Sequence, residues 1–223
     1  MSRARKYFAW QSRLACNELG RRVVEVGCGV GNFTSQLLNR ELVIGLDVES
    51  PCVEQLLVRY SDQKNLLAFT MDVTEPRFRD LIEFRPDSVV CLNVLEHIED
   101  DIVALFNMGA VLPAGGCIVL IVPAFQSLYG PIDHNLGHWR RYERSSLRRV
   151  AEKAGLAVRT LHYMNFVGFF GWWMNARILH RTKQSEAQIA LFDSVIVPVI
   201  SRLEGWVPPP FGQNLFAILE KRA

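Results

Sequence analysis

The segment that most constrains this chain is a β-branched run that leads directly into three closely spaced glycines. It reads Val23-Val24-Glu25-Val26-Gly27-Cys28-Gly29-Val30-Gly31-Asn32-Phe33-Thr34. Glycine permits a tight turn and lets the backbone approach a ligand without a Cβ in the way, and the free N–H groups at a helix start favour electron-rich atoms. The segment therefore predicts a strand, a loop that binds a nucleotide-like ligand, and the start of a helix.

Short β-branched runs alternate with amphipathic stretches along the chain, which is typical of βαβ units that build a parallel sheet. Seven runs are predicted as strands: residues 22–26, 42–47, 66–71, 88–92, 117–122, 157–163 and 214–220. Helices are predicted at the N-terminus and at residues 32–40, 51–60, 100–112 and 145–154, the last with Ser145 as its N-cap and Gly155 after its end.

Polar side chains follow the next three predicted strands. Asp47 closes the second strand, where a carboxylate can accept hydrogen bonds from both hydroxyls of an unphosphorylated ribose. Asp72 follows the third strand, where it could accept from an adenine amino group or cap the next turn, and Asn93 follows the fourth. Glu25 likewise could face the ligand or brace the glycine loop. The strand ends thus converge on one ligand site.

In this order, the motifs resemble those of the class I S-adenosylmethionine-dependent methyltransferases over about residues 22–124. That family has an acid-x-Gly-x-Gly-x-Gly pattern, an acid closing strand two, another closing strand three, and a Leu-Glu-His-like segment after strand four. Those places are filled here by Glu25, Gly27, Gly29 and Gly31, by Asp47, by Asp72, and by Leu95, Glu96 and His97.

The resemblance implies that S-adenosylmethionine is the cofactor. It places Glu25 and the glycine loop at the methionine portion, Asp47 at the ribose, Asp72 and the backbone of Val73 at the adenine, and Asn93 beside the methionine amine. The other expected cofactor contacts are Cys28, Val48 and Val94. Glu96 and His97 lie where a helix begins, and we interpret both as structural.

The loop after the fifth strand, residues 123–142, is dense in polar and aromatic side chains and should lie over the cofactor. His134 and His138 are the candidates for proton transfer, with Asp133 to orient a nearby imidazole. The other candidates are Tyr129 for catalysis and Arg140, Arg141 and Tyr142 for substrate binding. Alternatively, the loop folds over the site through its own Asp–His and Arg–acid pairs.

The expected fold class is α/β: a doubly wound, mostly parallel seven-stranded sheet whose last strand is antiparallel. A single domain, residues 1–223, would comprise a cofactor-binding half (22–124), a substrate loop with a helix and a strand (125–163), and a helical cap inserted before the final strand (164–212). The cap aromatics could wall an apolar pocket or simply pack in the core; they are Phe166, Phe169, Phe170, Trp172 and Trp173.

Charge, motifs and cysteines argue against several kinds of partner. A nucleic-acid partner is not expected, because the net charge is only +2 and no Asn-Pro-Pro-Tyr-like motif follows strand four. Five scattered cysteines, an odd number, indicate neither a disulfide framework nor a zinc site, and no metal is expected. The N-terminus lacks the apolar core of a signal peptide, so a cytoplasmic location is expected. Residues 160–176 are too short to span a bilayer but could contact a membrane surface.

We therefore expect a methyltransferase that acts on an oxygen or nitrogen of a small-molecule, glycan or lipid-linked acceptor. The Gly137-to-Tyr142 segment resembles bacterial enzymes of the small-molecule or surface-glycan type. The alternatives are a non-catalytic S-adenosylmethionine-binding module and a nicotinamide-dependent oxidoreductase, although the glycine spacing and Asp72 count against the latter. The oligomeric state is left open.

Overall fold

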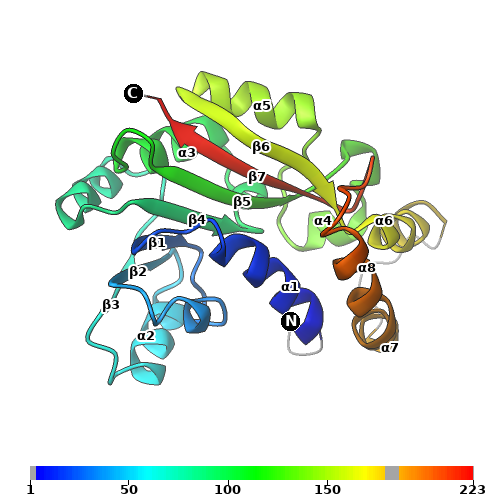
Figure 1. The fold of residues 1–223 in the computed structure, drawn as a ribbon, viewed down its shortest axis with the longest axis horizontal. Coiled ribbons are helices and arrows are strands. Elements are labelled where there is room, and N and C mark those ends of the chain that lie inside the picture. Colours follow the sequence, from blue (N-terminus) through cyan, green and yellow to red (C-terminus); the bar gives the residue numbers. More distant parts are fainter. Residues whose placement is uncertain (1–3, 179–185, 223) are drawn as a thin grey trace.

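The computed structural model describes residues 4–178 and 186–222 (Figure 1). The described residues form one seven-stranded sheet in the order β3-β2-β1-β4-β5-β7-β6. β7 runs antiparallel to both of its neighbours, and the other pairs are parallel, as expected. The strands are β1 (Arg22–Val26), β2 (Leu42–Asp47), β3 (Leu66–Thr70), β4 (Ser88–Leu92), β5 (Cys117–Pro123), β6 (Leu156–Met164) and β7 (Asn214–Lys221).

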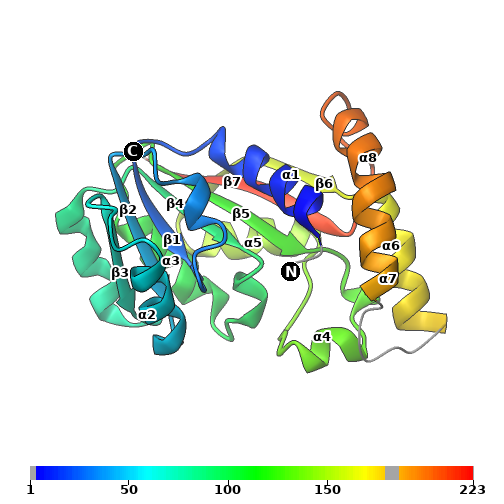
Figure 2. The ribbon, with the colours of Figure 1, turned by 90° about the horizontal axis from the view of Figure 1, so that it is seen from below.

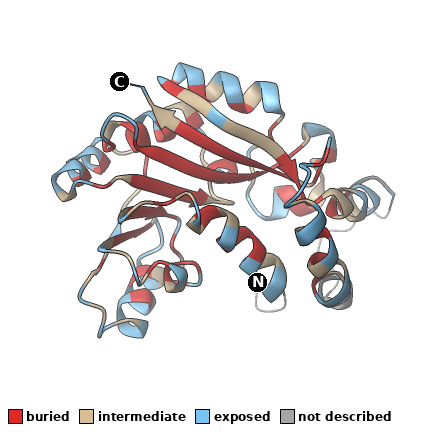
Figure 3. Cartoon of the chain, viewed as in Figure 1, coloured by how far each residue is buried: buried red, intermediate tan, exposed pale blue. Residues whose placement is uncertain are grey.

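Helices cover both faces of this sheet (Figures 1 and 2). α1 (Arg5–Cys16) and α2 (Ser50–Arg59) lie on one face, where Trp10 and Leu56 pack in one core cluster with Val23. α3 (Asp101–Ala110) and α5 (Arg144–Lys153) lie on the other, where Met108 and Leu147 pack in a second cluster. Because β5 is covered on both faces, every one of its residues is buried (Figure 3). A strand in this position must be apolar throughout.

Two helix predictions were wrong in detail. The predicted helix at residues 32–40 is a single 3-10 turn, η1 (Thr34–Gln36), because Gln36 and Leu37 donate their N–H groups three residues back. The buried Thr34 anchors this turn by donating its hydroxyl to Glu25. Ser145 is not the N-cap of α5: Glu143 holds that position, and its N–H donates to the Ser146 hydroxyl.

Short helices also appear in the connections. They are η2 (Pro76–Phe84), η3 (Leu95–His97), η4 (Gln126–Leu128) and α4 (Pro131–Asn135). The last two belong to the loop that was predicted to cover the cofactor, so this loop contains short helices that the sequence did not predict.

The described part of the segment between β6 and β7 is helical as far as Leu203, and turns and irregular structure follow over residues 204–213. This confirms a helical insertion before the last strand. It contains α6 (Phe166–Trp173), η5 (Met174–Ile178), α7 (Glu186–Leu191), η6 (Phe192–Ile196) and α8 (Val197–Leu203). Residues 179–185 of the predicted insertion lie outside the described residues. Figure 2 shows these helices standing together at one end of the sheet, beyond the end of β6.

None of the described helices is long and apolar enough to cross a membrane. Contact with a membrane surface stays a prediction. Exposed apolar side chains do recur every four residues along the insertion, at Leu191, Val195, Val199 and Leu203.

Candidate functional site

The glycine loop after β1 has the conformation that its glycines permit. Gly27, Gly29 and Gly31 have φ angles of 78°, 51° and 84°, which side-chain-bearing residues rarely adopt. A Cβ on Gly27 would lie 2.2 Å from Cγ2 of Val94, so the loop needs glycine there for space as well. The N–H of Gly29 donates to Oδ2 of Asp47 at 2.8 Å, which joins the loop to the end of β2.

Gly31 packs against neighbouring side chains. It does not line the pockets that contain the other predicted cofactor contacts, and a Cβ at Gly31 would meet Tyr60 at 2.7 Å and Leu56 at 2.9 Å. The Tyr60 hydroxyl also donates to the Gly31 carbonyl at 3.1 Å. Gly31 therefore lets α2 and Tyr60, the residue that follows α2, pack closely against the loop.

A large cavity of about 1280 Å³ opens at the carboxyl ends of the first strands; we call it the cofactor cavity. Seven of the predicted cofactor contacts line it: Gly27, Asp47, Val48, Asp72, Val73, Asn93 and Val94. Three more, Glu25, Cys28 and Gly29, line a smaller pocket of about 120 Å³ that shares Gly27 and Asn93 with it. The structure thus brings together every predicted cofactor contact except Gly31.

The carboxylates of this region also shape the backbone. Asp47 accepts the Gly29 N–H with one oxygen and the Glu49 N–H, at 3.0 Å, with the other. One oxygen of Asp72 accepts both the N–H and the hydroxyl of Thr74 at 2.8 Å, which is the turn-capping role considered from the sequence. A carboxylate has about four acceptor positions, so both retain capacity for a ligand.

Glu25 is the buried acid of the site. Burial raises its pKa to about 8, while the hydrogen bond from the Thr34 hydroxyl, 2.6 Å long, acts in the opposite direction. Glu25 braces the loop through this side-chain hydrogen bond rather than through backbone N–H groups.

A second cavity, of about 750 Å³, shares Asn93 and His97 with the cofactor cavity. Elements distant in sequence form its walls. Its lining includes Tyr7, Phe8 and Gln11 from α1, Glu96 from η3, Ile132, Leu136, His138 and Arg141 from the loop after β5, and Trp172 from α6. Sequence reasoning missed the α1 residues, because an amphipathic N-terminal helix carries no signal of what it covers.

Asp133 organises the loop side of the second cavity. Its fully buried carboxylate accepts from Nε of Arg141 at 2.8 Å and contacts Nδ1 of His138 at 2.9 Å. Burial alone would raise the pKa of Asp133, but these two partners lower it below its usual value. The Arg141 guanidinium also donates to the Ala124 carbonyl at 3.1 Å and stacks 4.5 Å from the centre of the Trp172 ring. The imidazole that Asp133 contacts is therefore that of His138 and not that of His134.

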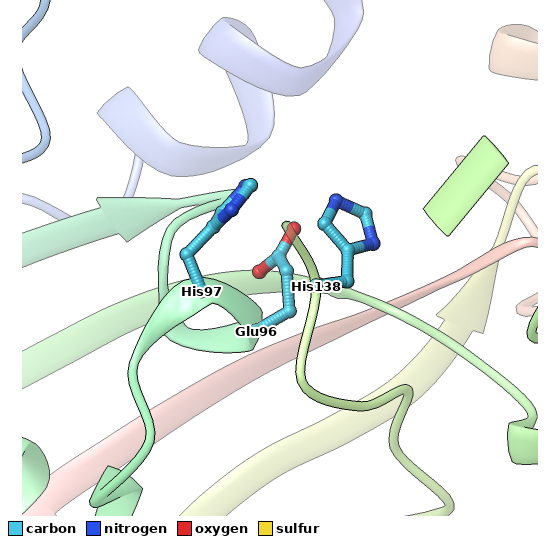
Figure 4. Close-up of side chains that lie close together, drawn as sticks. All are labelled: Glu96, His97 and His138. Carbon is cyan, nitrogen blue, oxygen red and sulfur yellow. The ribbon is translucent and has the colours of Figure 1, made fainter. Parts of the chain in front are cut away.

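Glu96, His97 and His138 lie close together and all line the second cavity, and His97 lines the cofactor cavity as well (Figure 4). The His97 and His138 rings meet edge to face, with centroids 4.6 Å apart. Glu96 is 1% exposed, and burial raises its pKa to about 8. Burial and the neighbouring His138 lower the pKa of His97. The Trp139 N–H donates to the Glu96 carbonyl at 2.8 Å, which joins the two backbones.

The remaining predicted loop residues lie elsewhere. His134 is exposed and lines neither cavity. Tyr129 donates its hydroxyl to the His138 carbonyl at 2.7 Å and so holds the backbone of that residue.

Arg140 and Tyr142, predicted to bind substrate, instead tie the loop to α3. Both contact Oδ2 of Asp101, at 2.8 Å, and Arg140 also donates to the Glu99 carbonyl at 2.7 Å. The buried Tyr142 lines neither cavity. Arg140 and Arg141 therefore point to different acids, and only Arg141 reaches the second cavity. The Asp–His and Arg–acid pairs that the loop-folding alternative expected are also present, as Asp133–His138 and Asp133–Arg141.

This sheet order, with a glycine loop and acids at the strand ends, defines a class I methyltransferase fold. Residues 2–161 match the protein family described as "Methyltransferase domain", so the chain belongs to this family. Its cofactor is accordingly S-adenosylmethionine, and the family match favours a methyltransferase over the oxidoreductase alternative.

Known proteins agree with this assignment. The ubiquinone biosynthesis O-methyltransferase of Alkalilimnicola ehrlichii is 24% identical over 161 residues, which span 66% of this chain and 65% of that protein. The S-adenosylmethionine-dependent methyltransferase from Mesorhizobium loti shares the fold, with a TM-score of 0.63 at 13% identity, covering 94% of this chain and 95% of that one. The N-methyltransferase NodS from Bradyrhizobium japonicum, solved with S-adenosyl-L-homocysteine, gives a TM-score of 0.61 at 15% identity, covering 98% and 87%.

The residues present fit this cofactor. A Cβ built on Gly29 would meet no atom within 4 Å, so the loop offers open space next to its backbone. Asp47 and Asp72 bring acceptor oxygens to the larger cavity, and Glu25 brings a carboxyl group to the smaller one. An adenosyl group has donors for the first two, and the methionine portion has polar groups that can hydrogen-bond with the third.

Proposed function

We propose that this chain transfers a methyl group from S-adenosylmethionine to an oxygen or nitrogen of a small-molecule, glycan or lipid-linked acceptor bound in the second cavity. The observation that carries this proposal is the junction of the two cavities at Asn93 and His97. An acceptor in one cavity and a methyl donor in the other would meet at that junction.

The lining of the second cavity suits an acceptor with an apolar body and a polar end. Tyr7, Phe8, Ile132 and Trp172 supply aromatic and aliphatic surface. Glu96 and His138 place their polar groups beside His97 at the junction, and Arg141 lines the same cavity. The O-methyltransferase relative supports an oxygen as the atom modified.

On the cofactor side, we assign the ribose hydroxyls to Asp47, the adenine to Asp72 and Val73, and the methionine portion to Glu25, Cys28 and Gly29. The two adjoining pockets support the separation of the methionine portion from the adenosyl portion. The division between ribose and adenine follows the order of the acids in the family pattern. Asn93 lines both pockets and would lie beside the methionine amine, and Val94 lines the larger pocket next to it. Val48 would pack beside the ribose.

S-adenosylmethionine, when bound, supplies a methyl group on a positively charged sulfur, so its leaving group is already activated. The protein then has to orient the acceptor and to accept the proton that the acceptor loses. Asp133 fixes the His138 ring by accepting from Nδ1, which leaves Nε2 unprotonated in the neutral tautomer. His138 therefore presents a nitrogen lone pair to the second cavity. Tyr129 supports it through the backbone.

The proposal is tested in two stages. Calorimetry should detect binding of S-adenosylmethionine and S-adenosylhomocysteine to the purified chain. Incubation with a methyl-deuterated cofactor and a panel of phenols, amines, sugars and lipid-linked glycans should then yield a product that carries the deuterated methyl group by mass spectrometry. Binding without turnover on the whole panel would favour the non-catalytic module instead.

A further inference from the structure

We infer that Glu96, His97 and His138 form a binding site for a divalent transition-metal ion at the junction of the two cavities. Each residue offers one ligand atom, and these three atoms lie within 4.8 Å of one another (Figure 4). Metal–ligand bonds of about 2 Å require ligand atoms about 3–3.5 Å apart. Small side-chain rotations would therefore close the site around an ion.

The donor set defines the kind of ion. Two imidazoles and one carboxylate suit zinc, iron, cobalt or manganese in the divalent state, whereas calcium and magnesium prefer oxygen ligands alone. Three protein ligands also leave coordination positions open, as catalytic sites do and closed structural sites do not. The open positions would face the cavities that His97 and His138 line.

Glu96 gives an independent reason to place a cation here. Its Oε2 atom is buried without a hydrogen-bond partner in the described part of the chain, and the residue is 1% exposed. An unsatisfied buried carboxylate oxygen is costly, and a bound cation would satisfy it. The nearby Arg141 does not, because its guanidinium is paired with Asp133 and the Ala124 carbonyl.

His138 is also held as metal-binding histidines usually are. Such a ligand normally donates its second ring nitrogen to a carboxylate or carbonyl, which fixes the ring and raises its basicity. Nδ1 of His138 lies 2.9 Å from Oδ1 of Asp133. Asp133 is itself fixed by Arg141 and by the Gly130 N–H at 3.1 Å. The ring therefore directs Nε2 toward Glu96 and His97 (Figure 4).

The consequence for methyl transfer rests on the proposed function. An ion at this position would lower the pKa of an acceptor hydroxyl in the second cavity, and the proton would leave to solvent. The acceptor oxygen would then attack the methyl carbon. The carbon–oxygen bond forms as the carbon–sulfur bond breaks, with its electron pair staying on sulfur. Glu96 and His97, assigned structural roles from sequence, would instead be ligands.

Cobalt binding tests the site without any acceptor. The full chain is treated with a chelator, dialysed, and titrated with Co²⁺ while visible absorption is recorded. We expect one equivalent to bind, with d–d bands of a histidine- and carboxylate-ligated ion. His97→Ala, His138→Ala and Glu96→Gln should each weaken binding by more than a hundredfold, and Asp133→Asn by about 10–100-fold through the His138 ring.

His134→Ala is the matched control, because it removes an exposed imidazole from the same loop. Cobalt binding should not change in this variant, and circular dichroism should show all variants folded. Two results would overturn the inference: no spectral change on the wild-type chain, or wild-type cobalt affinity in folded His97→Ala and His138→Ala.

Activity separates this inference from the proposed function. If the variants lose cobalt as expected but no acceptor is ever methylated, the metal site stands and the proposed function fails. If the chelated chain methylates an acceptor at its full rate and binds no cobalt, the metal site fails. His138 is then the proton acceptor, and the proposed function stands.

Discussion

The carboxylate of Asp47 is shared between the protein and the proposed ribose contact. Asp47→Ala would remove the proposed acceptor for both ribose hydroxyls, and hydrogen bonds to charged groups contribute about 1.5–3 kcal/mol each. We expect cofactor affinity, measured by calorimetry, to fall by at least about a hundredfold. Asp80→Ala, which alters an exposed acid of η2, should leave affinity unchanged. Equal cofactor binding by the Asp47 variant would contradict the ribose assignment.

The raised pKa of Glu25 predicts a pH-dependent stability. Its pKa is about 8 in the folded chain against an ordinary value of 4.5, so the folded state keeps a proton that the unfolded state releases between these values. The free energy of unfolding of the wild type should therefore decrease, relative to Glu25→Gln, as pH rises from about 5 to about 8. Urea unfolding of both proteins at several pH values measures this difference. A constant difference would mean that Glu25 is ionised throughout.

His138 and the cofactor contacts should separate in kinetics. His138→Ala removes the ring that faces the second cavity but none of the residues of the glycine loop. We expect kcat to fall about 100-fold or more, while the Kd for S-adenosylhomocysteine stays within about twofold. A loss of both turnover and S-adenosylhomocysteine affinity would place His138 in the cofactor site. An unchanged kcat would mean that the loop covers the site without taking part in the reaction.

At the scale of elements, Gly31 shows how the loop is fitted to α2. Gly31→Ala would strain a φ of 84° and bring a Cβ to 2.7 Å from the Tyr60 ring. Gly115→Ala is its control, because Gly115 has a φ of 79° but open space around it. Denaturant unfolding should show a loss of about 1 kcal/mol for Gly115→Ala and a further 1–3 kcal/mol for Gly31→Ala from overpacking. Equal losses would mean that α2 moves away freely.

The match between predicted and observed elements follows from their burial. Residues 22–26, 42–47 and 88–92 form strands with the predicted bounds, because strands covered on both faces are continuous apolar runs. The prediction of a helix at residues 32–40 was wrong in extent. Thr34 donates its hydroxyl to Glu25, a buried acid of β1, and this hydrogen bond holds the chain in a short turn. That contact cannot be seen in the local pattern.

For the whole molecule, Asp193 ties the insertion to the N-terminal helix. This buried carboxylate accepts the backbone N–H groups of Lys6 and Tyr7, at 3.1 and 2.8 Å. Asp193→Ala would leave both donors without their acceptor and should cost about 2–4 kcal/mol in urea unfolding. Asp193→Asn keeps one acceptor oxygen and should lose about half as much. Because Tyr7 lines the second cavity, acceptor KM should rise in parallel. Wild-type stability in Asp193→Ala would show that the two elements are held by apolar contacts alone.

The sheet, the glycine loop and the acids at the strand ends could be predicted from the residues alone, because each lies within one strand–loop unit whose pattern is local. The second cavity and the Glu96–His97–His138 group form only when the chain folds. Their members come from α1, η3, the loop after β5 and the insertion, and no spacing along the chain relates them. For the same reason, neighbouring residues such as Arg140 and Arg141 received different partners: the folded surroundings, rather than residue type, chose which acid each could reach.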